Sequence, residues 1–175
     1  MLYYLFYFVD FFTPFNLFRY LTFRTMGALL TSLLIAFLCG KPFIAWLKSK
    51  QKEGQPIRTD GPESHLITKK GTPTMGGVLI LFSLTLSTLL WANVSNPYIL
   101  ITLLVTLGFG GLGMMDDYLK LTKRSSKGLS GKGKLLIQTT LSCLAVWAYI
   151  YATGDQLATS LAIPFTKSMT IPLGW

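Results

Sequence analysis

Charged residues are scarce in this chain of 175 residues. They make up 13% of the sequence, whereas an ordinary soluble domain is about 25% charged. None occurs among the 45 positions from Gly71 to Met115, and hydrophobic residues make up 51% of the chain. Low charge combined with long uncharged stretches excludes an ordinary soluble domain and predicts an integral membrane protein.

Cysteine and histidine are rarer still. The two cysteines, Cys39 and Cys143, both lie in apolar stretches and are 104 residues apart, so we expect neither a disulfide nor a metal site from them. His65 is the only histidine, and a single histidine in a polar segment is more often a surface residue than a ligand. The N-terminal segment lacks a basic region followed by a small-residue cleavage site, so no cleaved signal peptide is expected.

Acidic residues are also few, seven against 16 lysines and arginines, which gives a net charge of +9. A nucleic acid is one partner that such a charge could indicate. However, 13 of the 16 basic residues lie within two polar segments, 41–70 and 120–134, that separate apolar ones. This distribution follows the positive-inside rule. We therefore expect no nucleic-acid partner, a cytoplasmic location for both basic segments, and a periplasmic N-terminus.

The uncharged stretch is too long for one membrane crossing. At 1.5 Å per residue it would reach about 68 Å, twice the roughly 30 Å of a bilayer core. The turn-forming residues 93–97 predict that the chain folds back there. We expect an all-α integral membrane protein with one membrane domain and about four transmembrane helices, at about residues 25–47, 74–92, 98–115 and 135–154. The cytoplasmic loops would be 48–70 and 116–134.

The two ends of the chain have other patterns. Residues 1–24 contain 11 aromatic side chains, which favours an interfacial helix leading into the membrane. Near the other end, apolar residues alternate with polar ones on both sides of Thr166–Ser168. Period two around a short polar turn predicts a small β-hairpin, which the expected topology places in the periplasm.

Two adjacent carboxylates, Asp116 and Asp117, follow the uncharged stretch directly. Acids that border membrane helices are costly and indicate a functional site. With lysines close by, they are a suitable seat for a divalent cation and a phosphorylated substrate. Alternatively, the i,i+4 spacing of Asp116 and Lys120 makes them an ordinary helix-stabilising pair, worth about 0.2–0.5 kcal/mol. The pattern alone leaves both interpretations open.

Three segments together resemble one protein family. Asp60–His65 (DGPESH), Gly71–Gly77 (GTPTMGG) and Asp116–Lys120 (DDYLK) are similar to segments of bacterial phospho-N-acetylmuramoyl-pentapeptide transferases, within the superfamily of polyprenyl-phosphate N-acetylhexosamine-1-phosphate transferases. The resemblance extends from the aromatic N-terminus to Trp175. It implies a ten-helix enzyme of the bacterial inner membrane that acts in peptidoglycan synthesis, of which this chain would be the N-terminal half.

The family resemblance also implies a reaction and a set of site residues. Such enzymes transfer phospho-MurNAc-pentapeptide from UDP-MurNAc-pentapeptide to undecaprenyl phosphate, giving lipid I and UMP, with Mg²⁺. Asp116 and Asp117 match the catalytic aspartates and would be Mg²⁺ ligands. Asp116 would help to activate the lipid phosphate and Asp117 would organise the metal and diphosphate, although these roles could be exchanged. The substrate-binding lysines would be Lys69, Lys70, Lys120 and Lys132.

Other parts of the family pattern are not found within residues 1–175, among them a third catalytic aspartate and a nucleoside-recognition loop. We therefore expect the chain alone to be inactive and to need a missing C-terminal half. Membrane lipid and a second copy, forming a homodimer, are further expected partners. Two alternatives remain: a polyprenyl-phosphate GlcNAc-1-phosphate transferase, which should lack the combination of segments 60–65 and 71–77, and a non-catalytic membrane fragment.

Overall fold

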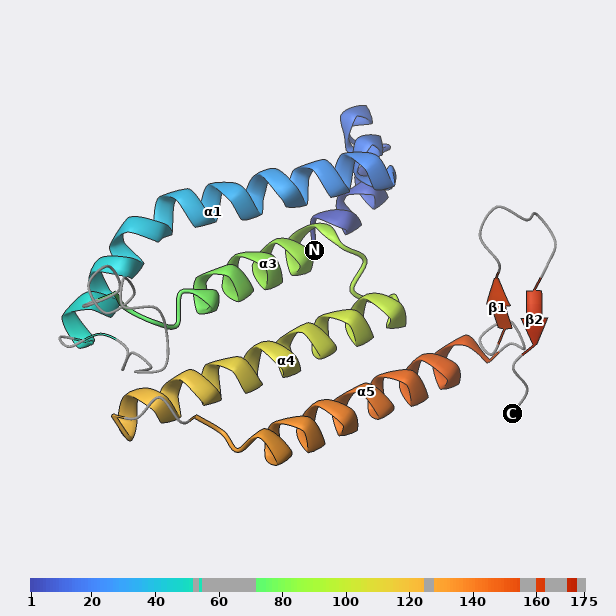
Figure 1. Ribbon diagram of the computed structural model, residues 1–175. Coiled ribbons are helices and arrows are strands. Elements are labelled where there is room, and N and C mark those ends of the chain that lie inside the picture. The colour runs from blue at the N-terminus through green and yellow to red at the C-terminus, as the bar shows by residue number, and fades with distance from the viewer. Residues whose placement is uncertain (52–53, 55–71, 125–127, 155–159, 163–169, 173–175) are drawn as a thin grey trace.

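The computed structural model describes residues 1–51, 54, 72–124, 128–154, 160–162 and 170–172. Within these residues the main elements are the helices α1 (Leu21–Lys50), α3 (Gly77–Trp91), α4 (Pro97–Thr122) and α5 (Gly131–Thr153). They lie side by side in chain order, and each packs against the next (Figure 1). The predicted all-α membrane architecture is confirmed by this helical row.

Three of these helices, α1, α4 and α5, are long and apolar enough to cross a membrane. Helix α3 is apolar but has only 15 residues, so it reaches about 22 Å, less than the roughly 30 Å of a bilayer core. It begins at Gly77, whereas the sequence predicted a span from residue 74. Met75 has a φ of 71°, a left-handed conformation that a helix cannot include. Of the four predicted spans, three correspond to helices that are long enough to cross a membrane.

Helices α1, α4 and α5 extend beyond the predicted bounds at one end or at both. Helix α1 begins at Leu21 and ends at Lys50, and the remainder of the predicted loop 48–70 lies almost entirely outside the described residues. The predicted loop 116–134 is wrong at both ends, because α4 continues to Thr122 and α5 already begins at Gly131. Hydropathy marks where charge begins, whereas the backbone hydrogen bonds of a helix continue past that point into the aqueous region.

Helix α1 contains Pro42 and bends in its C-terminal third (Figure 1). A proline inside a helix lacks the backbone N–H that would bind the carbonyl one turn earlier, and its ring crowds that carbonyl. Pro42 therefore accounts for the bend. It carries the last turns of α1 toward the end of α4.

The N-terminal segment forms two short 3₁₀ helices, η1 (Leu2–Phe8) and η2 (Thr13–Arg19). The prediction of a single interfacial helix over residues 1–24 is wrong in this respect. Pro14 lies in the first turn of η2, and Tyr20 is extended with φ −76° and ψ 129° before α1 begins. The aromatic side chains instead pack together, and Phe18 stacks on Trp91 of α3 with 5.8 Å between ring centroids.

Two short strands follow α5. Strand β1 (Ser160–Ala162) pairs antiparallel with β2 (Thr170–Pro172), and Leu161 lies opposite Ile171. The residues of the predicted turn between them lie outside the described residues. The periplasmic location of this pair stays a prediction.

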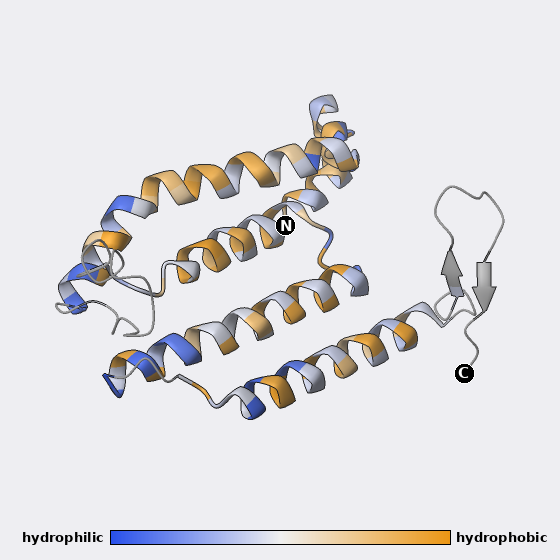
Figure 2. Ribbon diagram, viewed as in Figure 1, coloured by the Kyte–Doolittle hydropathy of each residue, from blue (hydrophilic) through white to orange (hydrophobic). Residues whose placement is uncertain are grey.

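Most apolar side chains lie on the outer surface of the helices. Among the described hydrophobic residues only Leu47, Leu103 and Leu112 are buried, whereas many leucines and aromatics are more than half exposed. Hydrophobic residues occupy the middle of the helical row, and hydrophilic residues gather at one end of α1, α4 and α5 (Figure 2). So much apolar surface is characteristic of contact with lipid or with other membrane helices, which supports a multi-pass membrane protein.

Gly27 allows α1 and α3 to approach closely. The indole N–H of Trp91 donates to Thr31 Oγ1 at 2.9 Å, and the Thr31 hydroxyl donates to the Gly27 carbonyl at 2.7 Å. A Cβ atom on Gly27 would lie 2.5–2.6 Å from three atoms of the Trp91 ring. The ring is held by its hydrogen bond, so it cannot move away without losing that contact.

We expect Gly27→Ala to lower the free energy of unfolding by about 1–3 kcal/mol, the usual cost of overpacking. Gly40→Ala, in the same helix, is the matched control because a Cβ atom there would meet nothing within 4 Å. Thermal unfolding of both variants in detergent measures the difference. Equal stability of the two variants would contradict the close packing of Gly27 on Trp91.

Candidate active site

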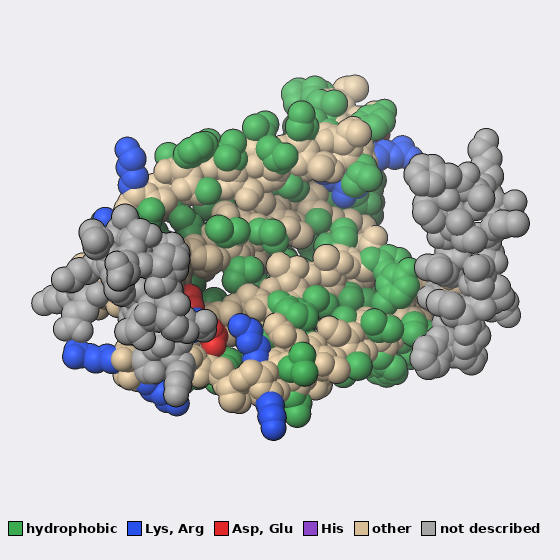
Figure 3. Space-filling model, in the orientation of Figure 1, with side chains coloured by type: hydrophobic (Ala, Val, Ile, Leu, Met, Phe, Trp, Pro, Cys, Tyr) green, Lys and Arg blue, Asp and Glu red, His purple; other side chains and the backbone are tan. Residues whose placement is uncertain are grey.

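Asp116 and Asp117 lie in the last turns of α4, at the end of the molecule where acidic and basic side chains meet (Figure 3). The ammonium of Lys120 lies between them, with Nζ 2.7 Å from Asp116 Oδ2 and 3.3 Å from Asp117 Oδ1. Residues three and four apart share one face of a helix, so the helix itself brings the three side chains together. The expected helical ion pair therefore forms, and it also holds the two carboxylates in one cluster.

Asp116 is the more enclosed of the two acids, and the whole residue is 9% exposed. Its Oδ1 accepts a hydrogen bond from the backbone N–H of Leu129 at 2.8 Å. The backbone of Gly128 packs directly on the carboxylate, where a Cβ atom would collide with Oδ1. Lys134, in the first turn of α5, adds a favourable electrostatic interaction. Asp116 therefore ties the end of α4 to the segment that leads into α5.

Asp117 connects α4 to a different part of the chain. Its Oδ2 accepts a hydrogen bond from the Thr74 hydroxyl at 2.8 Å. The Thr74 backbone is held in turn by the side-chain amide of Gln51, which accepts from the Thr74 N–H at 2.9 Å and donates to the Thr74 carbonyl at 3.2 Å. Thr74 thus links the end of α1 to this carboxylate on α4.

Sequence reasoning missed several of these residues. Thr74 lies within the segment 71–77 that carries the family resemblance, so its hydroxyl could have been marked as a candidate. Gln51 and Gly128 gave no signal, because a single glutamine at a helix end and a single glycine in a polar loop occur in most proteins.

The four predicted substrate-binding lysines have different placements. Lys120 contacts both acids. Lys132 is exposed in the first turn of α5, and its side chain makes no hydrogen bond or ion pair with a described residue. Lys69 and Lys70 lie outside the described residues, as does the segment 60–65. The binding roles of all four stay predictions.

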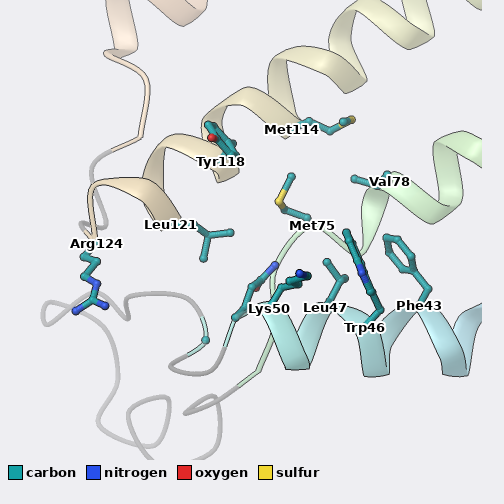
Figure 4. A pocket seen from close by; sticks show the side chains of 12 residues that line it. Phe43, Trp46, Leu47, Lys50, Met75, Val78, Met114, Tyr118, Leu121 and Arg124 are labelled. Atoms are coloured by element: carbon teal, nitrogen blue, oxygen red, sulfur yellow. The ribbon is translucent and has the colours of Figure 1, made fainter.

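A largely apolar cleft of about 960 Å³ opens next to this cluster (Figure 4). Met75 and Tyr118 line it, and each directly follows a residue of the Thr74–Asp117 contact, so the cleft adjoins the acid site. Its other lining residues lie in or just after the C-terminal parts of α1 and α4 and at the start of α3: Phe43, Trp46, Leu47, Lys50, Gln51, Gly54, Val78, Met114, Leu121 and Arg124.

The two carboxylates suit a magnesium ion that shares its coordination with a substrate. The described residues contain no group of three or more histidine, cysteine or acidic side chains that could hold a metal. Mg²⁺ commonly binds through one or two carboxylates, water and substrate phosphates, so two acids are enough. Asp117 fits better, because its side chain is 29% exposed and that of Asp116 is 12% exposed.

Comparison with known proteins points to one family. Residues 69–81 match signature 1 of the phospho-N-acetylmuramoyl-pentapeptide-transferases. The chain is also 55% identical over 161 residues to a protein of Granulibacter bethesdensis named phospho-N-acetylmuramoyl-pentapeptide-transferase. The predicted resemblance is confirmed. The aligned region covers 92% of this chain but 44% of the relative, so the chain spans less than half the length of this transferase. The signature contains Thr74, the residue that contacts Asp117.

Proposed function

We propose that this chain contributes the paired-acid part of a phospho-N-acetylmuramoyl-pentapeptide transferase. The enzyme would transfer phospho-MurNAc-pentapeptide from UDP-MurNAc-pentapeptide to undecaprenyl phosphate, giving lipid I and UMP. The observation that carries this proposal is the hydrogen bond between Thr74 and Asp117. It joins Thr74, within the segment that matches the family signature, to Asp117 of α4, which lies 43 residues away.

The cluster is suited to this reaction because phosphoryl transfer depends mainly on positioning and on charge stabilisation. An oxygen of the lipid phosphate would attack the phosphorus attached to the sugar, and the bond from that phosphorus to the UMP oxygen would break. Mg²⁺, when bound, would neutralise the diphosphate and stabilise the leaving UMP. Asp117 would bind the metal ion, and Asp116 is a second candidate ligand.

The basic residues would bind the phosphates. Lys120 is positioned by both acids and so presents its charge at a defined place. Lys132 is exposed and therefore accessible to an incoming anion, and the prediction extends the same role to Lys69 and Lys70. We also propose that Asp116 activates the lipid phosphate. The contacts of its two carboxylate oxygens favour a second role, which is to hold Lys120 and the backbone of Leu129.

We also propose that the protein lies in the bacterial inner membrane with its N-terminus in the periplasm and the acid cluster at the cytoplasmic surface. The charge distribution supports this orientation. In a background without Cys39 and Cys143, a cysteine at position 95 should react with a membrane-impermeant thiol reagent in spheroplasts. A cysteine at position 123 should react only after permeabilisation. The reverse labelling pattern would overturn the orientation.

An activity assay separates the proposed function from its alternatives. The chain is expressed in membranes alone, and together with the part of the Granulibacter relative that the alignment leaves uncovered. Each sample receives undecaprenyl phosphate, Mg²⁺ and either UDP-MurNAc-pentapeptide or UDP-GlcNAc. We expect lipid I only when both parts are present, and no product from UDP-GlcNAc.

The other outcomes each have a clear meaning. Transfer from UDP-GlcNAc would support a GlcNAc-1-phosphate transferase, which the match of residues 69–81 disfavours. No product from either donor would favour a non-catalytic membrane fragment. Lipid I from the chain alone would show that the additional part is not needed.

A homodimer is also proposed, and the mass of the purified protein in detergent tests it.

A further inference from the structure

We infer that Gln51 is a positioning residue for Asp117 and acts on it through Thr74. The inference rests on the proposed function, because it assigns Gln51 to the same reaction. Gln51 lies outside the signature match of residues 69–81, at the end of α1. Gln51 would touch neither substrate nor metal, and its effect would be to hold the Thr74 hydroxyl where Asp117 needs it.

Gln51 is well anchored to do this. It caps the C-terminus of α1, and its backbone N–H donates to the Leu47 carbonyl at 2.8 Å. Leu47 is one of the few buried hydrophobic residues, with 4% exposure. The base of the Gln51 side chain is therefore attached to a packed part of the molecule.

The segment that Gln51 holds needs such support. Thr74 precedes Met75, whose φ of 71° is in the left-handed region, and a non-glycine residue there is strained. Among the described residues, Gln51 is the hydrogen-bond partner of both the N–H and the carbonyl of Thr74. The side-chain amide thus satisfies both polar groups of the Thr74 backbone, in a segment that belongs to no helix or strand.

The consequence reaches the acid site. With its backbone fixed, Thr74 directs its hydroxyl to Asp117 Oδ2, and the other oxygen, Oδ1, faces Lys120. Hydrogen bonds of this kind orient carboxylates, and their loss commonly lowers metal affinity or activity by about 10–100-fold. If Gln51 served only to end α1, its removal would reduce the amount of folded protein without affecting the turnover of what remains.

A double-mutant cycle separates these two roles. Transfer is measured with the chain and the uncovered part of the relative together, for Gln51→Ala, Thr74→Val and the double variant. We expect each single variant to lower kcat about 10–100-fold, with the KM for the nucleotide sugar nearly unchanged. The double variant should be no slower than the slower single variant, because both changes break one chain of contacts.

Two further variants serve as controls. Thr74→Ser keeps the hydroxyl and should retain most of the activity. Thr72→Val changes an exposed threonine in the same segment and should behave as the wild type. Losses in kcat that multiply in the double variant would overturn the inference. It would also be overturned if the transfer activity of Gln51→Ala fell only in proportion to the amount of folded protein.

Hydrogen exchange at the Thr74 amide gives a readout that does not depend on activity. Gln51→Ala should accelerate this exchange because the amide loses its acceptor, whereas Thr74→Val should leave the amide protected although the hydroxyl is gone. If the wild type shows no transfer, the proposed function fails while exchange still decides whether Gln51 holds this segment. Unchanged exchange in Gln51→Ala would overturn the inference in either case.

Discussion

Asp117→Asn should reduce lipid I formation by at least about 10²-fold, a loss typical of removing one preorganised electrostatic group from an active site. Asparagine has the same shape, and its amide oxygen can take the place of Asp117 Oδ2 and accept the hydrogen bond of the Thr74 hydroxyl. It lacks the negative charge that attracts Lys120 and would hold Mg²⁺. The initial rate of lipid I formation, with the complementing part of the relative present, measures the effect.

Asp10→Asn is the matched control for this substitution. Asp10 is an exposed acid in the N-terminal segment, far in the chain from α4, so its loss should leave the rate unchanged. Expression and thermal unfolding of both variants should stay close to the wild type. Near-normal turnover in Asp117→Asn would show that Asp117 stabilises the helix through its ion pair with Lys120 and is not needed for the reaction.

Gly128→Ala should disturb the other acid without changing any charge. A Cβ atom there would collide with Asp116 Oδ1, and it would lie 2.7 Å from Asp116 Cγ and 3.0 Å from Lys120 Cε. The carboxylate must then move off the Leu129 N–H. We expect activity to fall by about 10–100-fold, as for other residues that orient a site.

Gly131→Ala is the control for Gly128→Ala, because a Cβ atom at Gly131 would meet nothing within 4 Å. Lipid I formation and thermal unfolding should be measured for both variants. The Gly131 variant should remain close to the wild type in both. If the two glycine variants had equal activity, close packing of Gly128 on Asp116 would not matter for the site.

Local patterns were the predictable part of the site. Asp116, Asp117 and Lys120 lie within five consecutive residues, and their contacts follow from helical spacing. The same spacing could not show that the helix continues past the uncharged stretch to Thr122, since hydropathy reports charge and not backbone hydrogen bonding. For this reason the acids, expected in a loop, lie on a helix.

Contacts between distant segments were not predictable. Thr74 is 43 residues from Asp117, Gln51 is 23 residues from Thr74, and Leu129 is 13 residues from Asp116. No periodicity links such positions, because their meeting depends on how α1, α4 and α5 pack. The left-handed conformation of Met75 was equally hidden, because methionine does not ordinarily adopt it.

The sequence by itself determined that this is a helical membrane protein with two basic segments and a pair of acids between apolar spans. Those properties depend on composition and on the spacing of residues close together in the chain, and both can be read directly from the sequence. Only the tertiary structure decided which donors from other segments hold each carboxylate: the Leu129 N–H for Asp116 and the Thr74 hydroxyl for Asp117. Hydrogen bonds require atoms to lie about 3 Å apart, and only the packing of the helices brings residues so distant in sequence to that distance.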